Sequence, residues 1–174
     1  TSKLEKGIKY VKELEGESGE WYQLNENEYS AEIVKHGEIV ELNITNKSDN
    51  PDIDVEKDGI IQTTANQEIK YDFTIGNIGN VPLNNFTWYD YLPTEYVTAT
   101  KLVTGTYNQD IDYAIYYKTN KNDYRLLRDN LNTQTNNYID FSNLELDSDE
   151  YVTEFKAEFG NVYIGFSSVE KPQL

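Results

Sequence analysis

Residues 81–93 read Val-Pro-Leu-Asn-Asn-Phe-Thr-Trp-Tyr-Asp-Tyr-Leu-Pro, and this stretch indicates the fold class. Successive side chains of a β-strand point to opposite faces, so Phe86, Trp88 and Asp90 share one face. Because two large aromatic residues mark that face as the buried one, the pattern places a carboxylate in a hydrophobic core. A buried acid must be either paired or neutral.

A lysine completes a matching pattern upstream. Ile53, Val55 and Lys57 share one face of an expected strand, so an otherwise apolar face ends on a cation. Because one inward lysine and one inward acid each complete an apolar face, we expect Lys57 and Asp90 to meet in the same core. They would form either a buried ion pair or a covalent crosslink.

The composition is that of a folded, acidic β-protein. The 174 residues carry 31 acidic side chains against 15 lysines and arginines, and the formal charge of −16 argues against nucleic acid and anionic membranes as partners. Aromatic residues make up 13% of the chain, led by 15 tyrosines, which is enough for a packed core and too many for a disordered chain.

Two residue types are missing from the chain. The absence of cysteine excludes disulfides, thiolate metal sites and a cysteine nucleophile, and fits the outside of a Gram-positive cell as well as a cytoplasm. Methionine is also absent, and the chain begins abruptly with Thr1 and Ser2, which we interpret as an excised fragment. No signal peptide, long apolar span or sorting signal is present, so we expect any export or anchoring signal to lie outside it.

Short strand-like runs separated by turn residues recur along the chain. In residues 38–46 the apolar Val40, Leu42 and Ile44 alternate with polar side chains, and the polar connector 47–51 follows. Further strands are expected at 9–13, 29–34, 53–57, 67–77, 86–91, 96–103, 113–118, 138–141, 151–159 and 162–166, with a weak helical turn at 124–130. Many short strands with almost no helix predict an all-β fold of tandem β-sandwiches. We divide the chain into a first module at 1–48, a linker at 49–51 and a second module at 52–174.

The first module resembles a known family. Residues 4–13 (LEKGIKYVKE), 29–33 (YSAEI) and 40–47 (VELNITNK) resemble the C-terminal half of a collagen-adhesin B-type repeat. These SpaA-like, prealbumin-like repeats build stalks and pilins on Gram-positive bacteria. The resemblance covers about residues 1–48 and implies a partial prealbumin-like module.

Many such repeats carry a Lys–Asn isopeptide bond promoted by a glutamate. The resemblance matches Glu13 to the promoting acid and Asn46 to the amide partner. A dry core would favour this chemistry, because burial lowers the pKa of a lysine and raises that of a carboxyl. The strand carrying the lysine would precede residue 1, so the bond cannot form as in an intact repeat. Alternatively, Glu13 and Asn46 are ordinary polar residues near strand ends.

Residues 52–171 resemble the Ig-like, isopeptide-containing repeat domains of clostridial-type surface proteins. The resemblance rests on the opening lysine strand, the 81–93 segment, and the stretches 107–136 and 154–162. It matches Lys57 and Asp90 to the lysine and the catalytic acid of A-type isopeptide domains. No Asn-Thr-Ala-type last strand is present, so Asn161 is the candidate for the third member. The alternative is a buried Lys57–Asp90 salt bridge, or two side chains that extend to solvent.

Other candidate sites carry weaker signals. The acidic runs 147–150 and 108–112 could supply oxygen ligands for calcium, but neither has EF-hand spacing and acidic turns are usually solvated. His36 is the single histidine, and no Gly-x-Ser-x-Gly motif, phosphate loop or histidine cluster accompanies it. No motif favours one pair of acids as a glycosidase pair. We therefore expect no enzyme activity, no metal site and no cofactor.

The resemblances imply a structural role: a stalk or spacer region of a cell-wall-anchored, extracellular surface protein or adhesin. Its partners would be neighbouring repeat domains, without nucleic acid or membrane contact by this fragment. The competing function is an adhesive module that binds a host matrix protein or glycan, which an exposed aromatic patch on the second module would favour. Because residues 1–48 are too few to bury a sizeable core, we expect them to form a homodimer or to dock on the second module.

Overall fold

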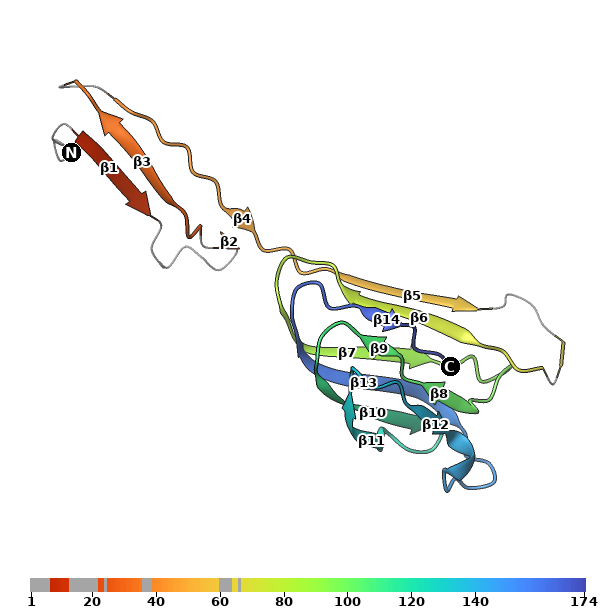
Figure 1. Ribbon diagram of the computed structural model, residues 1–174. Helices are drawn as coiled ribbons and strands as arrows, with labels where there is room; N and C mark the ends of the chain where they lie inside the picture. The colour runs from red at the N-terminus through yellow and green to blue at the C-terminus, as the bar shows by residue number, and fades with distance from the viewer. Residues whose placement is uncertain (1–6, 13–21, 24, 36–38, 60–63, 66) are drawn as a thin grey trace. The chain divides into compact units, whose positions relative to one another are not determined.

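The structure is a computed structural model that describes residues 7–12, 22–23, 25–35, 39–59, 64–65 and 67–174. The chain divides into two compact units, Thr1–Asn50 and Pro51–Leu174 (Figure 1). The boundary between them falls inside the predicted connector 47–51.

The first unit is built from two small antiparallel pairings. β1 (Gly7–Lys12) pairs with β3 (Glu28–Ile33) over six residue pairs, and β2 (Tyr22–Gln23) pairs with β4 (Lys47–Ser48). Residues 39–46, expected as a strand, form no ladder within the described part of the chain. None of the described residues of this unit whose exposure is known is buried, so the unit shows no core of its own there.

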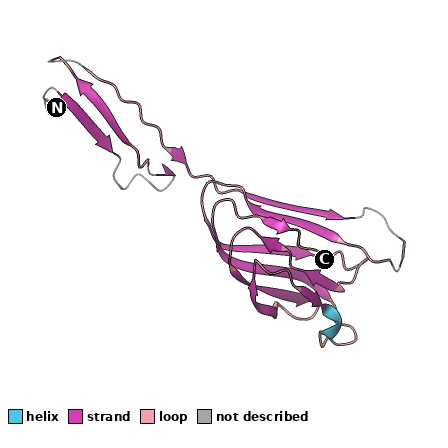
Figure 2. Ribbon diagram, viewed as in Figure 1, coloured by secondary structure: helices cyan, strands magenta, loops and turns pink. Residues whose placement is uncertain are grey.

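The second unit contains a four-stranded antiparallel sheet in the order β11-β10-β13-β7. Its strands are β7 (Leu83–Tyr91), β10 (Asp112–Thr119), β11 (Arg125–Asn132) and β13 (Val152–Val162). We call this the long sheet, and Figure 2 shows how completely strands dominate the unit.

The opposing sheet is assembled around the C-terminal segment. β5 (Ile53–Gly59) pairs with one edge of β6 (Tyr71–Asn77), and the last residues pair with its other edge, where the Phe73 amide donates to the Pro172 carbonyl. Gln173 in turn exchanges two backbone hydrogen bonds with Val103. In the same sheet β12 (Tyr138–Asp140) pairs with β8 (Lys101–Val103). A separate two-stranded ladder is formed by β14 (Ser168–Glu170) and β9 (Thr106–Tyr107).

A largely aromatic core joins the two sheets. Phe73 on β6 and Trp88 on β7 meet edge to face, with ring centroids 4.7 Å apart. The other fully or nearly fully buried rings are those of Phe86, Tyr107, Tyr113, Tyr117, Phe141, Phe155, Phe159 and Phe166. Two sheets packed face to face over one such core make a β-sandwich, so the prediction of an all-β sandwich fold is confirmed.

Two expected elements of the second unit also differ from the observed structure. The weak helical turn at 124–130 is strand β11, whose pairing with β10 is interrupted by register shifts, and Asn130 has a left-handed φ of 51°. These bulges add residues to one strand and remove the strict alternation that marks a strand in the sequence. The separate strand at 162–166 is absent, because β13 continues to Val162 and a turn follows, in which the Phe166 amide donates to the Tyr163 carbonyl. A short 3₁₀ helix, η1, spans Phe141–Asn143.

Candidate functional site

The predicted contact of Lys57 with Asp90 is observed, but the predicted burial of the 53/55/57 face is wrong, because Ile53 and Val55 are each 50% exposed and only Asp90 of the pair is buried. Lys57 on β5 and Asp90 on β7 belong to opposite sheets, and the Lys57 Nζ lies 2.6 Å from the Asp90 Oδ1. The same ammonium lies 4.5 Å from the ring centroid of Tyr71 and 5.3 Å from that of Phe73. The cation therefore sits between a carboxylate and two aromatic faces at the open side of the sandwich.

Burial controls the electrostatics of this pair. It raises the pKa of the Asp90 carboxyl above its ordinary value, although the hydrogen bond and charge of Lys57 act in the opposite direction. The Oδ2 atom of Asp90 is buried and accepts no hydrogen bond. Asp90 therefore has one carboxylate oxygen that accepts a hydrogen bond and one buried oxygen that accepts none.

The structure separates Asn161 from the pair that it was expected to join. Asn161 is exposed and lies six positions along β13 from Phe155, the register partner of Asp90, which is roughly 20 Å at the rise of a β-strand. Within the described residues, no carboxamide contacts Lys57. The described residues of the second unit thus bring together an amine and an acid, but not the amide carbon that a Lys–Asn bond requires.

The other isopeptide candidates belong to the first unit. Asn46 is exposed, and its position after Ile44 does not bury it. Glu13 lies outside the described residues, as does His36, the histidine considered as a catalytic base. The isopeptide role of Glu13 and Asn46 stays a prediction.

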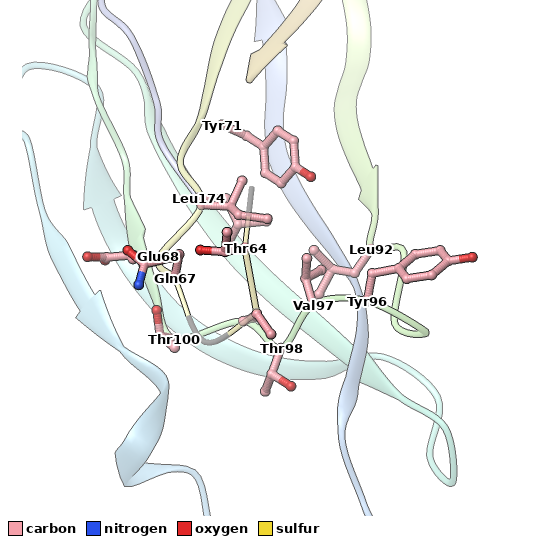
Figure 3. Close-up of a pocket in the computed structure, with 13 residues that line it drawn as sticks. Thr64, Gln67, Glu68, Tyr71, Leu92, Tyr96, Val97, Thr98, Thr100 and Leu174 are labelled. Atoms are coloured by element: carbon pink, nitrogen blue, oxygen red, sulfur yellow. The ribbon is translucent and has the colours of Figure 1, made fainter. Parts of the chain in front are cut away.

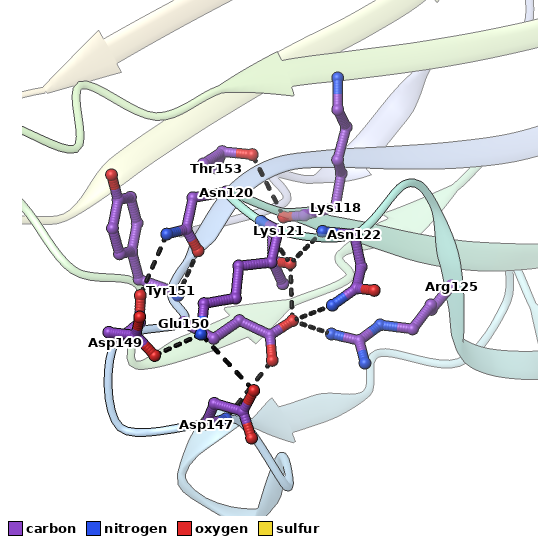
Figure 4. Close-up of polar contacts among 11 residues, drawn as sticks. Lys118, Asn120, Lys121, Asn122, Arg125, Asp147, Asp149, Glu150, Tyr151 and Thr153 are labelled. Atoms are coloured by element: carbon purple, nitrogen blue, oxygen red, sulfur yellow. Dashed lines mark hydrogen bonds and ion pairs between the residues drawn. The ribbon is translucent and has the colours of Figure 1, made fainter.

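The acidic turn before β13 forms a hydrogen-bonded cluster with the β10–β11 hairpin (Figure 4). Glu150 accepts hydrogen bonds from the Thr119 hydroxyl at 2.7 Å and from the Asn122 amide at 2.8 Å, and its Oε1 lies 2.5 Å from an Arg125 nitrogen. Its side chain is only 4% exposed. These hydrogen bonds, with the charge of Arg125, lower the pKa of Glu150 from 4.5 to about 2.

The remaining acids of the expected calcium runs are held by donors of the protein itself. The Lys121 ammonium forms ion pairs with both Asp149 and Asp147. The Asn132 amide donates to Asp110 at 2.7 Å and to Asp112 at 2.9 Å. In the described part of the chain, no three acidic or histidine side chains are grouped to hold a metal ion. Calcium binding at either run would have to displace these internal donors.

A pocket of about 850 Å³ lies beside the C-terminal end of the second unit (Figure 3). Its walls combine the apolar Leu92, Val97 and Leu174 with hydroxyl and amide side chains. The carboxylate of Glu68 in its wall is already paired with Lys101 at 2.9 Å. The described walls contain no converging pair of acids and no histidine that would support hydrolysis.

Sequence reasoning missed the role of Thr119 and Glu150, because nothing in an Asp-Ser-Asp-Glu run shows which acid turns inward. Comparisons with known proteins add no assignment: no family model, no curated protein and no solved structure matches this chain. The described residues also contain no helix with the length and apolar character needed to span a membrane.

Proposed function

We propose that the second unit, Pro51–Leu174, is a tension-bearing spacer in the stalk of a cell-wall-anchored bacterial surface protein or adhesin. The supporting observation is the path of the chain. The chain enters the unit through β5, where Ile53 pairs with Asn77 at one end of β6. The last residue, Leu174, pairs with Tyr71 at the other end of β6. The seven residues of β6 correspond to roughly 20 Å of strand. A module that is entered and left at opposite ends can be joined to others in a line.

The hydrogen-bond pattern suits resistance to pulling. β5 and the C-terminal segment both run antiparallel to β6, one on each of its edges. Tension between the two ends of the unit therefore acts along the strands, and the bonds of each ladder must slide and break together. The Lys57–Asp90 pair adds a tie from β5 to the long sheet.

The finer proposal, rigidification by an isopeptide bond, is supported only as far as this amine and acid lie in contact. The 2.6 Å separation of the Lys57 Nζ and the Asp90 Oδ1 is that of a hydrogen-bonded ion pair, which ties the two sheets without a covalent bond. The formal charge of −16 is consistent with the same role, because neighbouring stalks of like charge repel one another.

Single-molecule pulling tests the proposal, and the natural absence of cysteine allows two clean attachment geometries. Asp52→Cys with Leu174→Cys applies tension across the unit. Asp52→Cys with Ile78→Cys pulls on neighbouring residues, since the Ile78 amide donates to the Asp52 carbonyl at 3.1 Å, and peels β5 from β6 one bond at a time. We expect a several-fold higher unfolding force for the first geometry. Equal forces, or a lower force across the unit, would contradict the spacer role.

A further inference from the structure

The outer face of the long sheet is unusually rich in tyrosine. Because Phe86, Trp88 and Asp90 of β7 point into the core, Tyr89 and Tyr91 between and beyond them point outward. They are 47% and 66% exposed. With Tyr116 of β10 and Tyr124, which precedes β11, they form what we call the tyrosine face.

Three of the four rings, those of Tyr89, Tyr116 and Tyr124, make close contacts with neighbouring side chains. Tyr89 and Tyr124 meet edge to face with centroids 6.3 Å apart. The Lys156 ammonium lies 4.7 Å from the ring centroids of both Tyr116 and Tyr124. The Tyr124 hydroxyl donates to Glu154 at 2.7 Å. A partner would therefore meet a preorganised surface, which reduces the entropy lost on binding.

The lysines and glutamates of β10 and β13 on the tyrosine face pair with one another. Lys118 pairs with Glu154 at 2.7 Å, and Lys156 pairs with Glu158 at 2.6 Å. These four charges cancel, and Asp123 beside them adds one negative charge. Polyanions would be repelled by the molecule as a whole, and a cationic partner would find both carboxylates of the face already occupied.

Tyr89 and Tyr91 form the open margin of the face. They stand two residues apart on β7, hence roughly 7 Å apart along the strand. β7 is the end strand of the long sheet, so no further strand of that sheet covers this side of the rings. Two exposed rings in a row, with phenol hydroxyls beside them, offer both apolar and hydrogen-bonding surface to an extended ligand.

We infer that the tyrosine face binds a neutral polysaccharide, with successive sugar rings stacked on Tyr89 and Tyr91. Sugars present C–H faces that pack on aromatic rings and hydroxyl groups that bond to phenols and carboxylates. Such a ligand carries no charge and therefore leaves the two Lys–Glu pairs of the face intact. This inference is independent of the spacer role, since it uses the outer surface of the long sheet and not the β5–β6–C-terminal ladders.

Affinity electrophoresis of the full chain in native gels tests this inference, because a charge of −16 gives the protein strong mobility. The gels would contain galactomannan, xylan, dextran, a soluble β-glucan or the anionic alginate, one in each, and collagen-coated beads would test a protein partner. We expect at least one of the neutral polysaccharides to slow the wild-type chain, and the Tyr89→Ala/Tyr91→Ala variant to lose at least tenfold in affinity. The Tyr89→Phe/Tyr91→Phe variant keeps the rings and should retain most of the binding.

The matched control is Tyr96→Ala/Tyr138→Ala, which removes two tyrosines that are 83% and 75% exposed and belong to no strand of the long sheet. It should bind like the wild type, and the retardation should persist in high salt, because no charge is neutralised on binding. Four results would overturn the inference: no retardation in any gel, equal loss in both alanine variants, binding only to an anionic polysaccharide, or binding through these tyrosines to a matrix protein such as collagen instead.

Discussion

Lys57 and Asp90 form a 2.6 Å ion pair between the two sheets, yet their environments are unequal: the lysine side chain is 30% exposed and the aspartate side chain 7%. The ammonium can turn toward water if its partner is removed, whereas the carboxylate cannot. Deleting either partner of a buried pair leaves an uncompensated charge, and the cost depends on how deeply that charge is buried.

We therefore predict an asymmetric double-mutant cycle for this pair. Lys57→Met should lower the free energy of unfolding by ~3 kcal/mol, because it leaves Asp90 buried and unpaired. Asp90→Leu should cost ~1 kcal/mol, because Lys57 regains water. The double variant should be close to the wild type, since apolar side chains of similar volume replace both charges. Urea denaturation at pH 7 measures all three, and equal single costs would contradict the assignment of Asp90 as the more buried partner.

The pH dependence of Lys57→Met gives a second readout of the same pair. Without Lys57 the pKa of Asp90 should rise further, since the lysine is what opposes the effect of burial. When the pKa of a carboxyl in the folded state lies above its ordinary value of 3.8, the free energy of unfolding rises as the pH falls through the folded-state pKa. The deficit of Lys57→Met should therefore shrink on acidification, and a deficit that is constant between pH 7 and pH 4 would exclude this explanation.

Intact-mass spectrometry distinguishes an ion pair from a crosslink. We expect the purified chain to have the mass calculated from its sequence, because no carboxamide contacts Lys57 among the residues that the structure describes. A Lys–Asn bond would make the chain lighter by one ammonia, and a direct Lys57–Asp90 amide would make it lighter by one water. Lys57→Arg is the matched control, since it keeps the charge and forms neither bond. A loss of mass that disappears in this variant would establish the crosslink.

Glu150 should stabilise the second unit in a defined pH window. Its pKa is lowered from 4.5 to about 2 in the folded protein, mainly by the hydrogen bonds of Thr119 and Asn122. A depressed carboxyl pKa contributes stability that is fully present above pH 4.5 and is lost as pH falls toward 2. Melting temperatures followed by circular dichroism should show Glu150→Gln well below the wild type at pH 7.

The difference between Glu150→Gln and the wild type should narrow steadily as the pH falls toward 2, where the wild-type carboxyl becomes protonated. Glu145→Gln, at an exposed glutamate a few residues earlier in the chain, is the matched control and should track the wild type throughout. A gap between Glu150→Gln and the wild type that stays the same from pH 7 to pH 2 would mean that the carboxylate charge is not what stabilises this turn.

Alternation in the sequence was enough to predict the fold class and the Lys57–Asp90 contact. The strands 53–57, 86–91 and 113–118 all lie within observed strands. In the last two, strict alternation reflects one buried face, whereas Ile53 and Val55 of β5 are each 50% exposed. Very short strands such as β9 and β14 were missed, since two or three residues show no period. Their position depends on the C-terminal segment, which pairs with residues distant in the sequence.

The sites were harder to predict for the same reason. Asp90 ends an apolar pattern and could be recognised, whereas Glu150 stands in a run of four polar residues and is buried only because the β10–β11 hairpin supplies its donors. Asn161 was expected at the isopeptide site, but its distance from Asp90 follows from the register of β13 against β7, which local sequence does not encode.

The first unit leads to a prediction about assembly. Val40 and Leu42 are 43% and 37% exposed, and residues 39–46 form no ladder within the described residues. Alternating apolar segments that join no ladder recruit other strands. We predict that the chain forms a homodimer at micromolar concentration through this segment, measured by light scattering. Because each copy carries −16, the dimer should strengthen as salt screens the repulsion.

Variants of one residue each can locate the dimer contact. Val40→Glu or Leu42→Glu should give monomers, because a buried unpaired charge would face the partner strand. Ile78→Glu, at a 63% exposed position of the second unit, should leave the dimer intact. A monomer whose residues 1–48 resist protease would show that the first unit folds without a second copy. Rapid trimming of the monomer back to the 47–51 connector would show that the first unit does not fold alone. Either result would mean that the dimer prediction is wrong.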